Sequence, residues 1–146
     1  MRTGFDIDII RLNIARTKRV LPIALAKITE NHFTESFKVG RLDEHKWKEV
    51  QRRIPGTNAY KYPRKKGLSR RTSPILVRTG NLRRKTSRSI ASATWAKVQL
   101  INDLPYAKAQ NEGTDTIDAR PFMIHTNKLG GLQKAEIDKQ MKKIWV

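Results

Sequence analysis

Apolar residues recur at helical spacing along the first forty residues, at separations of three, four or their sums. The positions that carry this spacing are Phe5, Ile7, Ile10, Ile14, Leu21, Leu25, Ile28 and Phe33. Proline fits the first turn of a helix better than its interior, so Pro22 predicts a break near residues 18–21. We therefore expect a second helix over residues 22–37, which Gly40 ends.

The middle of the chain has neither helical nor strand periodicity. Residues 41–50, which include Trp47, predict a short helix or a turn. The stretch that follows, as far as Pro74, is rich in Pro, Gly, Ser, Lys and Arg. We expect a long basic loop over about residues 52–73, and we expect it to become ordered only on a partner.

Short apolar runs and turn residues alternate after this stretch. Ile75 to Val77 is such a run, and residues 78–81 predict a turn followed by a helical turn at Leu82. The apolar positions over 90–100 fit two strands with a turn near Ala93, or one bent strand.

The last forty residues predict further short elements and a closing helix. One or two helical turns are expected over 106–111, a loop over 113–118 and a short strand over 121–124. The final helix begins at Asn127 or Leu132 and ends at Ile144. Its expected apolar stripe consists of Leu132, Ala135, Met141, Ile144 and Trp145.

These elements predict an α+β fold, a small and mainly antiparallel sheet covered by the long N-terminal helix and the C-terminal helix. The chain has 146 residues, which is the usual size of one domain, so we expect a single domain over residues 1–146. It has no cysteine, so its stability depends on packed side chains.

Charge adds a second kind of information. The formal net charge is +18, and residues 50–102 contain fourteen Lys or Arg and no Asp or Glu. Such a one-signed block predicts an acidic partner or nucleic acid nearby, although a generic solvated surface is the alternative. Tyr60 and Tyr62 lie within it and could stack bases or tether a loop. The expected contacts to phosphate or an acidic partner are Lys61, Arg64, Lys65, Lys66, Arg70 and Arg71.

Motifs of catalysis and metal binding are not found. His32, His45 and His125 lie on separate segments without the spacing of a zinc site, and the acidic pairs fit turns and helix starts. Phosphate-binding glycine loops and a nucleophile elbow are also missing from the sequence. We expect no enzymatic activity, cofactor or metal. We also expect no signal peptide and no membrane span, and hence a protein made and kept in a cytoplasm.

Three motifs follow one another in the second half of the chain. They are an apolar run before Thr79-Gly80-Asn81-Leu82-Arg83, then Tyr106-Ala107 with Gly113, then Ala119-Arg120-Pro121-Phe122. This order resembles the phage virion morphogenesis family of tail-completion and head-tail joining proteins. The N-terminal half is also similar, since Phe33 and Phe37 precede Trp47 as aromatic residues precede a tryptophan in that family.

The resemblance implies a structural virion protein in the neck of a tailed phage. Copies would form a ring of six or twelve subunits that contacts portal, connector and tail proteins, with non-specific DNA contact along the channel. The structural or interface positions it implies are Gly80, Leu82, Arg83, Tyr106, Gly113, Arg120, Pro121 and Phe122. The sequence departs from the family in its long basic stretch and in Glu44-His45-Lys46 before the tryptophan.

The motif residues also have structural roles that follow from their chemistry. Gly80 can adopt a positive φ, Leu82 can anchor a turn, and Tyr106 offers a ring for burial. Arg120 precedes a proline and is biased to extended backbone, from which its guanidinium can reach a carbonyl or carboxylate. Two other classes of function stay open, a small non-specific nucleic-acid-binding protein and a basic nuclease or toxin.

Overall fold

The computed structural model describes residues 6–62 and 69–145, and its longest element is the helix α1 (Ile7–Val39). Asp6 begins this helix, because its Oδ1 accepts hydrogen bonds from the amides of Asp8 and Ile9 at 3.0 and 3.3 Å. Gly40 ends it with a φ of +73°, as predicted.

The predicted break before Pro22 is wrong, since α1 continues through this residue. A proline inside a helix costs about 3 kcal/mol, because it removes one N–H donor and crowds the preceding turn. Pro22 is itself buried, and so are its neighbours Leu21 and Ala26. Burial of this apolar stretch offsets the cost of the proline.

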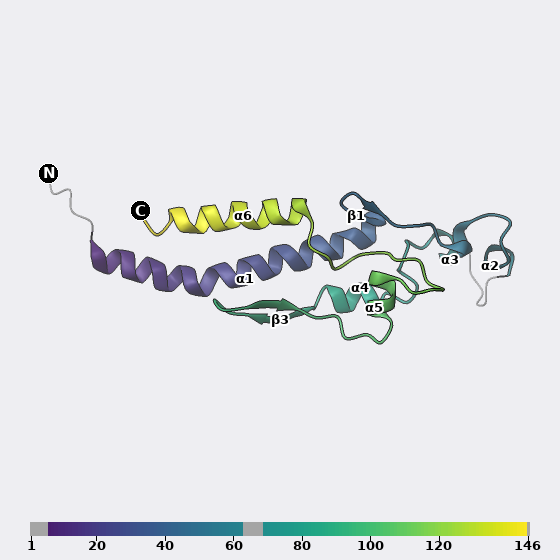
Figure 1. Ribbon diagram of the computed structural model, residues 1–146, viewed down its shortest axis with the longest axis horizontal. Helices are drawn as coiled ribbons and strands as arrows, with labels where there is room; N and C mark the ends of the chain where they lie inside the picture. Colours follow the sequence, from purple (N-terminus) through teal and green to yellow (C-terminus); the bar gives the residue numbers. More distant parts are fainter. Residues whose placement is uncertain (1–5, 63–68, 146) are drawn as a thin grey trace. The chain divides into compact units, whose positions relative to one another are not determined.

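The chain divides into two units, which are described separately. The first contains Met1–Asn31, Ser89–Ile101 and His125–Val146, and the second contains His32–Arg88 and Asn102–Ile124. The α+β class is confirmed, with a long N-terminal helix, a C-terminal helix and antiparallel strands. The strands form two separate two-stranded sheets (Figure 1).

In the first unit, α1 is flanked by a hairpin and by the C-terminal helix (Figure 1). The hairpin consists of β3 (Ile90–Ala93) and β4 (Val98–Leu100), so two strands with a turn are confirmed. Glu30 holds the start of the hairpin, because its Oε1 accepts from the amides of Ser89 and Ile90 at 3.0 and 3.4 Å.

The helix α6 (Asn127–Lys142) runs antiparallel to α1. Gln133 donates to the Thr29 hydroxyl at 3.0 Å, and Asn13 donates to the Ile144 carbonyl at 3.4 Å. The predicted apolar stripe is wrong apart from Ile144, because the other four members are exposed. Leu129, Gln140 and Ile144 are the buried residues of this segment.

In the second unit, α1 leads into a hairpin of β1 (Arg41–Leu42) and β2 (His45–Lys46), where a short helix or turn was predicted. The predicted loop over 52–73 is also wrong in its described part. It contains three short helices, which are η1 (Gln51–Arg53), α2 (Asn58–Lys61) and α3 (Ser69–Thr72). Thr57 caps α2, because its hydroxyl accepts from the Tyr60 amide at 3.2 Å.

Two further short helices complete the second unit, α4 (Asn81–Thr86) and α5 (Ala107–Glu112), both as predicted. The predicted strand over 121–124 is wrong. In place of a partner strand, Oδ1 of Asn111 accepts from the amides of Phe122 and Met123, both at 2.9 Å. The core of this unit consists of Phe37, Trp47, Ile75, Leu82, Ala107 and Phe122. None of the helices in the described ranges is long and apolar enough to span a membrane.

Candidate functional site

The first motif forms the start of α4. Gly80 is the residue before the helix and has a φ of +77°, so the predicted positive φ is confirmed. Leu82 is 4% exposed and lies in the core, which confirms its anchoring role. Arg83, the next residue, is exposed. The motif therefore aims one side chain inward and leaves a cation on the surface.

The second motif forms α5, where the buried residue differs from the expected one. The Tyr106 ring is 43% exposed, so its predicted burial is wrong, and Ala107 is 4% exposed and belongs to the core. Tyr106 is the residue before the helix, and its side chain makes no capping hydrogen bond. The close packing of α5 depends on the small residue.

Gly113 follows α5 at a position that a side chain cannot occupy. Its φ is +81°, and a Cβ built on it would lie 2.9 Å from the Ala119 nitrogen and 3.0 Å from the Ile117 oxygen. Both neighbours are backbone atoms, so they cannot move aside without shifting the loop. This glycine lets the chain after α5 fold back closely on itself.

The third motif fastens this loop to the segment after β2. Arg120 is 8% exposed, and its Nε donates to the Lys48 carbonyl at 3.0 Å. One of its terminal nitrogens donates to the Asp118 carbonyl at 3.4 Å, and its own amide donates to the Gln110 carbonyl at 2.8 Å. The expectation that Arg120 reaches a carbonyl is confirmed.

Pro121 and Phe122 continue the same attachment. The Trp47 indole nitrogen donates to the Pro121 carbonyl at 2.7 Å. Phe122 is 1% exposed, and its ring centroid lies 5.4 Å from that of Phe37. Asn111, which holds the amides after Pro121, was not predicted, and an asparagine near a helix end gives no specific signal in sequence.

The basic positions expected to contact phosphate or an acidic partner are only partly described. Lys61 is exposed at the end of α2. Arg71 donates twice to the Tyr60 carbonyl, at 3.1 and 2.8 Å, and its guanidinium lies 4.3 Å from the Tyr60 ring centroid. Arg71 and Tyr60 therefore tether α3 to α2. Arg64, Lys65 and Lys66 lie outside the described residues, as does the side chain of Arg70.

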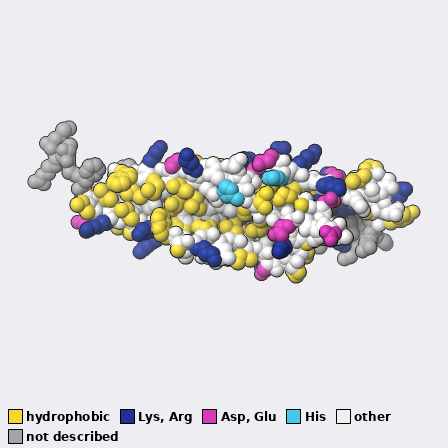
Figure 2. Space-filling model, in the orientation of Figure 1, with side chains coloured by type: hydrophobic (Ala, Val, Ile, Leu, Met, Phe, Trp, Pro, Cys, Tyr) yellow, Lys and Arg dark blue, Asp and Glu magenta, His cyan; other side chains and the backbone are white. Residues whose placement is uncertain are grey.

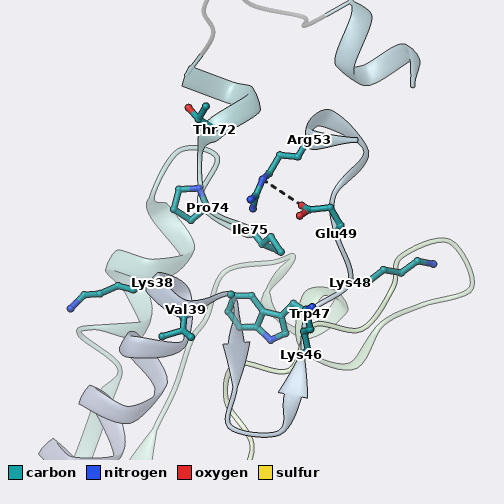
Figure 3. Close-up of a pocket in the computed structure, with 11 residues that line it drawn as sticks. Lys38, Val39, Lys46, Trp47, Lys48, Glu49, Arg53, Thr72, Pro74 and Ile75 are labelled. Carbon is teal, nitrogen blue, oxygen red and sulfur yellow. Dashed lines mark ion pairs between the residues drawn. The ribbon is translucent and has the colours of Figure 1, made fainter. Parts of the chain in front are cut away.

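The second unit contains a pocket of about 670 Å³ that the sequence analysis missed (Figure 3). It lies where the end of α1, the strand β2 and the segment before α4 meet. Apolar lining comes from Val39, Trp47, Pro74 and Ile75. Charged lining comes from Lys38, Lys46, Lys48, Arg53 and Glu49. No spacing rule joins these positions in sequence, because a hairpin and several turns bring them together.

A histidine and a carboxylate pair was also missed. His32 Nε2 lies 2.9 Å from Asp43 Oδ2, and the two side chains are 9% and 6% exposed. Asp43 is in the turn of the β1–β2 hairpin and has a φ of +51°. The pair fastens this turn to the last part of α1.

Large hydrophobic side chains are exposed in the first unit, and Figure 2 shows hydrophobic atoms gathered on one face over α1 and α6. On α1 the most exposed are Ile7 at 62%, Leu12 at 69% and Ile23 at 57%. On and after α6 they include Leu132, Met141 and Trp145. Exposed apolar surface can mark interaction sites in soluble proteins. We call these six residues the exposed apolar residues of the first unit.

Two carboxylates have altered acidity. A hydrogen bond from Gln140, at 2.5 Å, is the main cause that lowers the pKa of Glu136, with Lys139 adding to it. A hydrogen bond from Lys85 is the main cause that lowers the pKa of Asp103. In the described part of the chain, no three His, Cys, Asp or Glu side chains converge as metal ligands would.

Comparison with protein families, with curated proteins and with solved structures gives no match for this chain.

Proposed function

We propose that the chain is a structural subunit of a tailed-phage particle, which joins head to tail or completes the tail as a member of a ring in the neck. In this proposal its neighbours are portal, connector and tail proteins, and it catalyses no reaction. Its site is the virion neck, after assembly in the host cytoplasm.

The observation that carries the proposal is the order of the three motifs, together with the way their residues meet. Leu82, Ala107 and Phe122 come from three separate segments and pack into one core. Gly80, Gly113 and Arg120 set the turns that make this packing possible. Each motif therefore has a structural role in the fold of the second unit.

The exposed apolar residues of the first unit support an assembly role over a free monomer. Exposed Ile, Leu, Met and Trp side chains lose contact with water when a protein partner covers them, which stabilises a complex by roughly 25 cal/mol for each Å² buried. Contact with duplex DNA gains little from such residues, because the backbone of DNA is polar and charged.

A non-specific nucleic-acid-binding protein is the second candidate, and the net charge of +18 favours it. The number of copies in the assembled complex distinguishes the neck subunit from the nucleic-acid-binding protein. Purified protein should be examined by analytical ultracentrifugation and negative-stain microscopy, alone and with long duplex DNA. A neck subunit forms closed rings or joins phage structural proteins, whereas a nucleoid protein saturates the DNA as a monomer or dimer and forms no ring.

A further inference from the structure

The pocket at the end of α1 combines an apolar floor with a basic rim. Trp47 and Ile75 are 2% and 7% exposed and form part of the floor, and Val39 is 56% exposed at the edge. Figure 3 shows Lys38 and Lys48 extending from opposite sides of it. The volume of about 670 Å³ lies in the range of sites that hold a ligand's side chains.

The charges around the pocket are unequal, with four cations and one carboxylate. The carboxylate, Glu49, lies 3.5 Å from Arg53. Lys38 and Lys48 form ion pairs with Glu35 and Asp118, but their side chains are 60% and 70% exposed. Surface pairs of this exposure contribute about 0 to 1 kcal/mol, so both lysines can exchange these carboxylates for those of a ligand.

We propose that this pocket binds an acidic peptide segment of a partner protein, with a bulky apolar residue against the exposed side chains of Val39 and Pro74 and flanking carboxylates on Lys38, Lys46 and Lys48. The charge of the rim is complementary to such a segment. Val39 and Pro74 supply the specificity that a charged surface alone lacks. This inference stands on the pocket and is independent of the role proposed in the phage neck.

Nucleic acid fits the same pocket less well. Single strands bind by stacking bases on exposed aromatic faces, but Trp47 is 2% exposed and its indole nitrogen is held by Pro121. A phosphate backbone has no apolar group for Val39, Pro74 and Ile75. Glu49 on the lining would also repel phosphate.

The test measures the binding of a short fluorescein-labelled peptide to the 146-residue protein by fluorescence anisotropy. In this peptide two leucines are flanked by Asp and Glu. Two variants change exposed positions of the pocket, Lys46→Glu and Val39→Ser. Lys134→Glu, on the exposed surface of α6, makes the same charge change elsewhere. The competitor is a single-stranded oligonucleotide of the same net charge as the peptide.

We expect Lys46→Glu to weaken peptide binding about tenfold, and Val39→Ser several-fold, while Lys134→Glu has little effect. Replacing the leucines of the peptide by serine should weaken binding as Val39→Ser does. Absence of peptide binding to the unaltered protein overturns the proposal, and so does an affinity that neither pocket variant changes. A third outcome would also overturn the proposal: Lys46→Glu weakens peptide and oligonucleotide binding equally, and Val39→Ser weakens neither. The pocket would then be a phosphate site.

Discussion

Arg120 and Lys48 are 72 positions apart in sequence, and the Nε of Arg120 donates to the backbone carbonyl of Lys48 at 3.0 Å. The bond joins the loop after α5 to the segment after β2, beside the Trp47 to Pro121 bond. We expect Arg120→Ala to lower the free energy of unfolding by about 1.5 to 3 kcal/mol, because it removes charge-assisted hydrogen bonds from a buried position. Urea denaturation measures this.

Arg83→Ala is the matched control for Arg120. Arg83 is an exposed arginine of the same unit, so its removal should change the free energy of unfolding by less than about 0.5 kcal/mol. Equal effects of the two substitutions would contradict the attachment role of Arg120.

Gly113 and Gly131 predict opposite responses to alanine. Gly113→Ala brings a Cβ to 2.9 Å from a backbone nitrogen at a φ of +81°. We therefore expect this substitution to lower the free energy of unfolding by at least about 2 kcal/mol. Gly131 lies within α6 with open space at its Cβ position. Gly131→Ala should therefore raise the free energy of unfolding by up to about 1 kcal/mol. Thermal unfolding followed by circular dichroism compares them, and a harmless Gly113→Ala would refute the close approach.

Substitutions of Ser89 and Glu30 should also have contrasting effects on stability. The Ser89 hydroxyl is buried without a hydrogen-bond partner in the described structure, so Ser89→Ala should be neutral or stabilising by about 1 kcal/mol. Glu30→Ala should lower the free energy of unfolding by about 2 to 3 kcal/mol, because it leaves the amides of Ser89 and Ile90 without their acceptor. Chemical denaturation of both variants checks this, and a costly Ser89→Ala would show that its hydroxyl is bonded.

The pKa of Glu136 gives a prediction on pH. The hydrogen bond from Gln140 is the main cause that lowers this pKa in the folded chain. The ionised carboxylate of Glu136 therefore contributes stability to the fold at pH values above 4.5, the ordinary pKa of the group. That contribution is lost as the pH falls through the lower folded pKa. Gln140→Leu should raise the pKa of Glu136 and leave that of Asp103 unchanged, as NMR titration of the two carboxylates can show. An unmoved Glu136 would mean that Gln140 is not the main cause.

Local conformation was predictable wherever a single residue type dictates it. Gly40 ends α1, Gly80 adopts a positive φ and Leu82 anchors α4, as the sequence suggested. Pro22 failed as a signal, because burial along α1 outweighs the cost of a proline. Local preference is a weak predictor where tertiary packing is strong.

Residues that act through distant contacts were not predictable. Apolar spacing in α6 could not reveal which side faces α1, so Leu132 and Met141 were assigned to the wrong side. Asn111 replaces the strand expected over 121–124 by bonding two amides with its side chain. The basic pocket likewise forms only when the β1–β2 hairpin brings Lys46 and Trp47 near the end of α1.

The most direct measurement on the proposed role is electron microscopy and infectivity of phage particles made without this protein. The proposal predicts filled heads and assembled tails that do not join, with infectivity restored by the intact chain and only partly by Arg120→Ala. Empty heads alone would move the role to DNA packaging. Normally joined and infectious virions would contradict the proposal outright.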